Sequence, residues 1–221
     1  KRHKDGLFVA EGLRFCRDAI LSNVDVKSVY LSEEFISKHP DETAFFEKNC
    51  SNIFEISENI CKKIGSTVNS QGVFCLCEMP QISNDLTGNK YIVLENLNDP
   101  GNVGTIIRTA EAFGICGVIL VGNCVDVYSP KVLRSTMGTI FRIPIYKFEN
   151  ITELKKQLLL NNIALYGAVL DNKSKKLSEI SFENRIAIAI GNEANGLSYD
   201  TVCACDQLIF IEMNGGAESL N

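Results

Sequence analysis

The chain has 221 residues, of which 45% are hydrophobic and 22% charged, and its formal net charge is −5. This composition is ordinary for a soluble globular protein with one large or two small domains, and it argues against a surface coated in basic charge. The longest apolar runs, such as 115–121, are too short to span a membrane, so no membrane contact is expected.

The cysteines predict reduced, structural thiols in a cytoplasmic protein. There are nine, an odd number, and their spacing is irregular. Cys75, Cys116 and Cys203 lie in apolar runs, where a thiol behaves as a small hydrophobic group. The pairs 75/77 and 203/205 have too few His or Cys neighbours for zinc, so no metal site is expected.

Residues 1–80 alternate between short apolar strands and amphipathic helices, which predicts a small α/β domain. We expect a helix over 57–64, capped by Ser57. The expected strands are 7–10, 26–31, 53–56 and 72–77, and the other expected helices are 11–21 and 41–48. A stretch rich in Pro, Gly, Asn and Asp follows without an apolar period, and we place a linker at 81–89.

The alternation resumes over residues 90–221 and predicts a mostly parallel, doubly wound sheet. The expected strands are 91–95, 116–121, 143–147, 163–169, 185–190 and 207–211, and the expected helices are 103–113, 131–137 and 151–161. In such sheets ligands bind beyond the carboxyl ends of the strands. The polar, glycine-rich segments 98–104, 191–197 and 213–221 should therefore meet at one edge.

Common nucleotide and acid–base signatures are missing from the sequence. No G-x-G-x-x-G follows the first strand of the second domain, and no G-x-x-x-x-G-K-[ST] occurs. The two histidines, His3 and His39, fall in polar surroundings, so acid–base catalysis by histidine is not expected.

Four segments in order resemble the SpoU/TrmH family of RNA ribose 2′-O-methyltransferases, within the SPOUT superfamily. Its three motifs are matched by NDPGNVGTIIRTAEAFG at 98–114, GNEANGLS at 191–198 and IEMNGGAESLN at 211–221. The family's intermediate segment is matched by SPKVLRSTMGTIFRIP at 129–144. Residues 1–80 are similar, less sharply, to the ribosomal-protein-L30e-like domain that often precedes this catalytic domain.

The resemblance implies a fold and an assembly that periodicity could not indicate. It implies a SPOUT methyltransferase domain over 90–221, a C-terminal trefoil knot and a homodimer. The sequence departs from the pattern at Glu212, where the family usually has Pro, and it stops at Asn221, where the family continues into a helix.

The implied activity is transfer of a methyl group from S-adenosylmethionine to a ribose 2′-hydroxyl, with ribosomal RNA favoured as the substrate over transfer RNA. A transfer RNA substrate and a catalytically silent RNA-binding or assembly factor of the same fold are the alternatives. An enzyme acting on a small molecule would explain the second loop but not the RNA-type first domain.

The resemblance implies site residues at the positions that match the family's motifs. The implied catalytic residues are Asn102, Arg108, Ser219 and Asn221. The implied cofactor-binding residues are Gly191, Asn192, Glu193, Gly196, Leu197, Ile211, Met213 and Leu220. Local basic clusters predict RNA contacts at Lys4, Arg14, Arg17, Lys131, Arg134 and Arg142. Because arginine stays protonated at neutral pH, we expect Arg108 to hold a phosphate and a developing alkoxide rather than act as a base.

Overall fold

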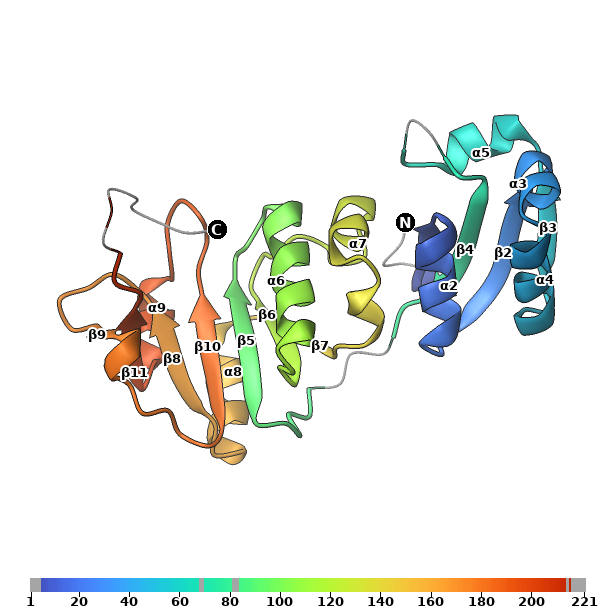
Figure 1. Cartoon of the computed structure of the whole chain (residues 1–221). Helices are drawn as coiled ribbons and strands as arrows, with labels where there is room; N and C mark the ends of the chain where they lie inside the picture. Colours follow the sequence, from blue (N-terminus) through green and yellow to red (C-terminus); the bar gives the residue numbers. More distant parts are fainter. Residues whose placement is uncertain (1–4, 68–69, 81–83, 214, 216–221) are drawn as a thin grey trace. The chain divides into compact units, whose positions relative to one another are not determined.

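The computed structural model describes residues 5–67, 70–80, 84–213 and 215, and the chain folds into two compact units (Figure 1). The first comprises Lys1–Gln81 together with Tyr128–Arg142, and the second comprises Ile82–Val127 together with Ile143–Asn221. The chain thus leaves the second unit after its second strand and returns to it at Ile143.

The first unit is built on a four-stranded sheet in the order β1-β4-β2-β3. Its strands are β1 (Leu7–Glu11), β2 (Val26–Ser32), β3 (Ile53–Ile56) and β4 (Val73–Glu78), with β4 antiparallel to β1 and β2, and β3 parallel to β2. Its helices are α2 (Leu13–Leu21), α3 (Glu33–Lys38), α4 (Pro40–Asn49) and α5 (Glu58–Ile64).

The segment 128–142 packs on the first unit through aromatic side chains. It forms α7 (Pro130–Thr136) and a short 3₁₀ turn, η1 (Thr139–Phe141). The ring of Phe8 lies 5.1 Å from that of Tyr128, and the ring of Phe15 lies 4.7 Å from that of Phe141. These tilted contacts anchor the segment because buried aromatic rings contribute large apolar areas.

The second unit contains a seven-stranded sheet in the order β7-β6-β5-β10-β8-β11-β9, and every pairing is parallel. Its strands are β5 (Lys90–Glu95), β6 (Gly117–Val121), β7 (Ile145–Phe148), β8 (Ala164–Ala168), β9 (Lys175–Lys176), β10 (Ile186–Ile190) and β11 (Gln207–Phe210). Its helices are α6 (Pro100–Ala112), α8 (Ile151–Leu160) and α9 (Tyr199–Ala204), with a 3₁₀ turn η2 (Leu177–Glu179).

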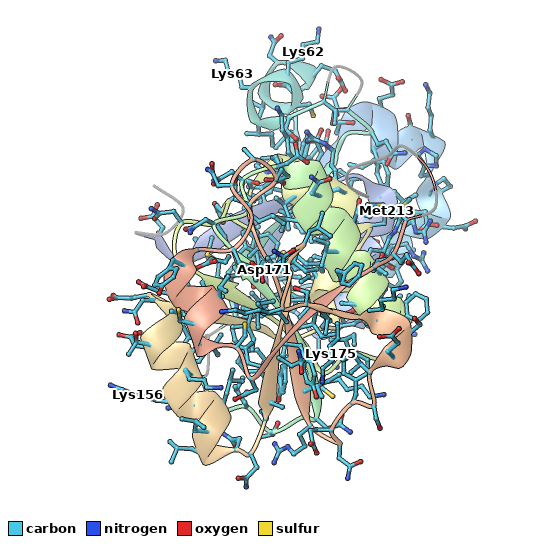
Figure 2. All side chains as sticks on the ribbon, turned by 90° about the vertical axis from the view of Figure 1, so that its left-hand side faces the viewer. Lys62, Lys63, Lys156, Asp171, Lys175 and Met213 are labelled. Carbon is cyan, nitrogen blue, oxygen red and sulfur yellow. The ribbon has the colours of Figure 1, made fainter. Side chains whose placement is uncertain are left out.

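Helices cover both faces of this sheet: α6 lies on one face, and α8 and α9 lie on the other (Figures 1 and 2). Apolar strands suit this arrangement because both of their faces are buried. All five residues of β6 are buried, and Val93, Ile119, Leu154, Leu165 and Ala189 share one core.

The predicted α/β class with a parallel second sheet is confirmed. The domain limits and the trefoil knot stay predictions, and residues 216–221, where the chain ends, lie outside the described part. Two short helices, α3 and α9, were not expected from the sequence. The expected Ser57 cap is wrong in one respect: Ser57 occupies the N-cap position of α5, but its side chain makes no capping hydrogen bond.

All nine cysteines lie in the described part of the chain as free thiols. Burial of Cys75 agrees with the expected structural role, whereas Cys203, on α9, is exposed. Within the residues that the structure describes, no helix combines the length and the apolar character needed to cross a membrane.

Helix α8 offers a matched test of the second core. Leu154 is 0% exposed and packs in this core, whereas Leu160 on the same helix is 76% exposed. Leu154→Ala should lower the free energy of unfolding by about 2–5 kcal/mol, because it removes buried apolar surface and leaves a cavity. Leu160→Ala should change it by less than about 0.5 kcal/mol. Urea unfolding of both variants checks this, and equal midpoints would contradict the packing.

Candidate active site

The candidate site lies where the central strands β5 and β10 end. These strands are neighbours, with Leu94 opposite Ile190, although they are far apart in sequence. Their arrowheads point to the same edge of the sheet (Figure 1). The loops that follow them, 96–99 and 191–198, therefore leave the sheet side by side, as the sequence predicts for the first two polar segments.

Two side-chain hydrogen bonds join the loops directly. Asn102 Nδ2 donates to Glu193 Oε1 at 3.0 Å, and Asn192 Nδ2 donates to the backbone oxygen of Asn96 at 3.0 Å. The structure thus brings together three of the predicted site residues, two from the second loop and one from the first turn of α6.

The first loop is shaped by local hydrogen bonds that start α6. Asn96 has a φ of 53°, a left-handed conformation that asparagine tolerates better than most residues, and its Oδ1 accepts from the backbone N–H of Asn123 at 2.9 Å. Asp99 caps α6 by accepting from the backbone N–H of Asn102 at 2.7 Å, with Pro100 in the first turn. Arg108, further along this helix, is exposed to solvent.

The second loop is closed on itself and leaves no space for a side chain at its start. A Cβ atom on Gly191 would lie 2.1 Å from the backbone carbon of Gly196, so only glycine fits. Asn192 and Gly196 exchange two backbone hydrogen bonds, at 3.0 and 2.8 Å. Asn192 Oδ1 also accepts from the N–H of Ala194 at 2.9 Å, so this side chain organises the loop as well as contacting the first one.

A buried carboxylate, which the sequence analysis did not assign to the site, fixes the exit of the second loop. Glu95 ends β5 and is 5% exposed. It accepts hydrogen bonds from the backbone N–H of Ser198 at 2.8 Å, from Ser198 Oγ at 2.7 Å and from Thr201 Oγ1 at 2.6 Å. The available sequence signal was an acidic residue at the end of an otherwise apolar strand.

The third predicted segment is described only in part. Ile211, just beyond β11, is 57% exposed, and Met213 is partly buried. Glu212 is held by an ion pair with Lys176 of β9, with Nζ and Oε1 2.7 Å apart. The predicted residues Ser219, Leu220 and Asn221 lie outside the described residues.

The predicted RNA-contacting residues are distributed over the first unit. Arg14 and Arg134 are exposed and line one depression, together with Phe15. Arg17 is engaged inside the unit, since it pairs with Glu42 and its guanidinium lies 4.2 Å from the ring centre of Phe45.

Of the remaining basic candidates, one is exposed and one makes a hydrogen bond within the unit. Lys131 is exposed on α7, and Arg142 Nη1 donates to the backbone oxygen of Gly138 at 3.4 Å. Lys4 lies outside the described residues. Exposed cations of the first unit thus include Arg14, Lys131 and Arg134.

Chemically, the described part of the site offers amides, exposed carboxylates such as Glu193, the guanidinium of Arg108 and glycine-loop backbone groups. His39 belongs to the first unit. Such groups suit positioning and charge stabilisation rather than proton transfer through an imidazole.

Comparison with known families gives two matches along the chain. The model of the SpoU rRNA Methylase family matches residues 89–221, and that of the MRM3-like substrate binding domain matches residues 1–75. The chain is also similar to the 23S rRNA (guanosine(2553)-2'-O)-methyltransferase RlmP of Bacillus subtilis. The two are 29% identical over 221 residues, which cover 100% of this chain and 86% of that protein.

Two solved structures share the arrangement over 100% of this chain. An AdoMet-bound rRNA methyltransferase from Sinorhizobium meliloti has a TM-score of 0.85 and 29% identity, with 84% of that chain covered. The SpoU methyltransferase AviRb from Streptomyces viridochromogenes, in complex with AdoMet, has a TM-score of 0.89 and 86% coverage; at 24% identity this likeness shows the fold alone.

The Glu95 carboxylate gives a test of the site's construction. Glu95→Gln keeps the shape but places an NH₂ group where an acceptor oxygen was, so at least one of the three donors loses its partner. Local opening around Ser198–Thr201 should become easier by about 1–3 kcal/mol, or roughly 5- to 150-fold in hydrogen-exchange rate. Glu183→Gln, at an exposed carboxylate, is the control. Unchanged exchange in this segment would contradict the assigned role of Glu95.

Proposed function

The chain belongs to the SpoU rRNA Methylase family, and we propose on this basis that it methylates a ribose 2′-hydroxyl of ribosomal RNA with S-adenosylmethionine. The observation that carries the proposal is the bond between Asn102 and Glu193. It unites the first and second family motifs at the carboxyl edge of a parallel sheet, where such sheets bind ligands.

The residues at this edge fit the proposed cofactor. The closed 191–197 loop presents glycine backbone, and Leu197 is partly buried. The side chain of Ile211, which follows β11 two strands away from β10 in the sheet, is more than half exposed. Exposed apolar side chains and backbone donors and acceptors are the groups that suit an uncharged adenine ring. We assign the cofactor to Gly191, Asn192, Glu193, Gly196, Leu197, Ile211, Met213 and Leu220. When bound, it supplies an activated methyl group on a sulfonium.

The chain's own residues then have distinct tasks. Arg108 keeps its positive charge and binds the phosphate next to the target ribose, so that the developing alkoxide lies beside a cation. Asn102 holds Glu193, and this bond keeps the two loops in one arrangement while RNA binds. We assign Ser219 and Asn221 to the ribose side of the site. The group that removes the hydroxyl proton is left unassigned.

Ribosomal RNA is favoured over transfer RNA for two reasons. The first domain matches a substrate binding domain model, and the Bacillus relative is named as a 23S rRNA methyltransferase. We further propose that residues 1–80 bind the RNA, that the enzyme works in the cytoplasm and that it is a homodimer with a knotted C-terminus. Light scattering of the full-length protein tests the dimer.

A catalytically silent RNA-binding factor is the rival from another class. The presence of Asn102, Arg108, Gly191 and Glu193 favours the enzyme, because a factor that only binds RNA has no need to keep this set or the bond between Asn102 and Glu193. Titration calorimetry with S-adenosylmethionine separates the two, with Gly191→Trp as the variant that blocks the loop.

The proposed function is tested by mapping 2′-O-methylation in total RNA from cells with and without the gene. One ribosomal position should lose its methyl group, and the wild-type gene should restore it. Loss confined to a transfer RNA would replace the substrate with the alternative named above. An unchanged methylation pattern in all RNAs would refute the enzymatic proposal.

Arg108 separates binding from chemistry. Arg108→Ala should lower kcat by roughly 10²–10³, because a charge-assisted contact to a developing oxyanion is lost, with cofactor affinity kept within a few-fold. Arg108→Lys should restore little, since an ammonium lacks the planar fork of a guanidinium. Single-turnover methylation at saturating RNA measures this. Near-normal kcat in the alanine variant would remove Arg108 from the reacting centre.

A further inference from the structure

A depression in the first unit combines charged and apolar side chains from segments far apart in sequence. It is lined by residues of α2, of the turn before β4 and of α7, and its volume is 190 Å³. The side chains that matter here are Arg14, Phe15, Asp18, Gln71, Arg134 and Met137. This volume is below the range of about 300–1,000 Å³ that holds drug-sized ligands, and it suits a single flat ring system.

Most polar groups around the depression are already engaged. Glu11 accepts from the N–H of Ser66 at 2.8 Å and from Thr67 Oγ1 at 2.6 Å. Burial raises the pKa of Glu11, but these hydrogen bonds outweigh it and hold the pKa below its usual value. Gln71 Oε1 accepts from the N–H of Leu13 at 2.8 Å. These two acceptors therefore build the wall rather than serve a ligand.

Asp18 is the acceptor that remains. Among the described residues its carboxylate takes part in no hydrogen bond or ion pair, and only its backbone oxygen accepts one, from the N–H of Ser22. The backbone of Gly138 passes close to it: a Cβ atom there would lie 2.3 Å from Asp18 Oδ2. With a φ of 88°, Gly138 passes close to the carboxylate, and a side chain there would collide with it.

The cations lie at the rim. Arg14 is exposed, and Arg134 is exposed while its Nη1 donates to Ser66 Oγ at 2.6 Å. That bond occupies one of the five N–H groups of the guanidinium and leaves the others for an anion. Phe15 and Met137 supply apolar surface in the lining of the same depression.

We propose that this depression holds one unpaired guanine of the RNA substrate. This proposal rests on the proposed function. A carboxylate accepts two parallel N–H bonds from the guanine N1 and 2-amino groups, whereas uracil, adenine and cytosine each offer it a single such group on this edge. Phe15 and Met137 contact the base, and Arg14 and Arg134 bind the flanking phosphates. Asp18 is thereby a residue of the first unit that selects the base.

The test uses the full-length protein and two fluorescent RNA probes, a short uridine strand and the same strand with one central guanosine. The guanosine strand should bind about tenfold more tightly. Asp18→Asn should reduce this preference to less than about twofold, while Asp41→Asn, which removes an exposed carboxylate on α4, should retain it. Replacing the guanosine by inosine, which lacks the 2-amino group, should cost several-fold with the unmodified protein and needs no variant.

The rim cations give an independent readout. Arg14→Ala should weaken binding of both strands equally and lower the slope of log Kd against log salt by about one, without changing the base preference. Lys62, labelled in Figure 2, is exposed in the last turn of α5. Lys62→Ala is therefore the matched control, and it should change neither the base preference nor the slope of log Kd against log salt.

No preference for guanosine in the unmodified protein, or a preference that survives in Asp18→Asn, would overturn the proposal. If the protein still methylates ribosomal RNA in either of these cases, the proposed function stands and only the guanine site is refuted. Absence of methyl transfer by the unmodified protein would instead count against that function, whatever the base preference.

Discussion

The parallel pairing of β5 with β10 is the contact on which the rest of the site depends. It places two loops that are some ninety residues apart at adjacent positions on one edge of the sheet. A buried carboxylate then fixes the position of the second loop. Glu95 ends β5 and accepts hydrogen bonds from Ser198 and Thr201, which follow the loop after β10. Glu95 costs free energy to bury, and three hydrogen bonds offset that cost, so the loops have one arrangement instead of several.

The chemistry available at this edge, among the residues that the structure describes there, rests on an arginine, amides and carboxylates. An arginine keeps its charge at every physiological pH, so it can neutralise a phosphate and an alkoxide, but it does not remove a proton readily. The amide of Asn102 and the carboxylate of Glu193 bond to each other, and this contact positions them rather than making either one a base. Catalysis built on such groups relies on preorganised charge and orientation.

Recognition of RNA by an acidic protein becomes understandable once the basic residues are placed. The overall charge is −5, yet exposed cations meet at one depression of the first unit. Arg17 belongs to the same sequence cluster as Arg14, but it forms an ion pair with Glu42 and a cation–π contact with Phe45. Local charge matters more than the total because salt screens interactions beyond about 8–10 Å.

The sequence by itself determined the α/β class, the parallel second sheet and the identity of the motif loops. Those features depend on local periodicity and on glycine and asparagine at strand ends, which are visible in a single chain. Only the tertiary structure decided that Asn102 meets Glu193, that Glu95 bonds Ser198 and Thr201, and that Glu212 pairs with Lys176. It likewise placed Arg134 and Asp18 at one depression and left Cys203 exposed. These contacts join residues from separate elements, and their partners follow from strand order and packing, which no local pattern encodes.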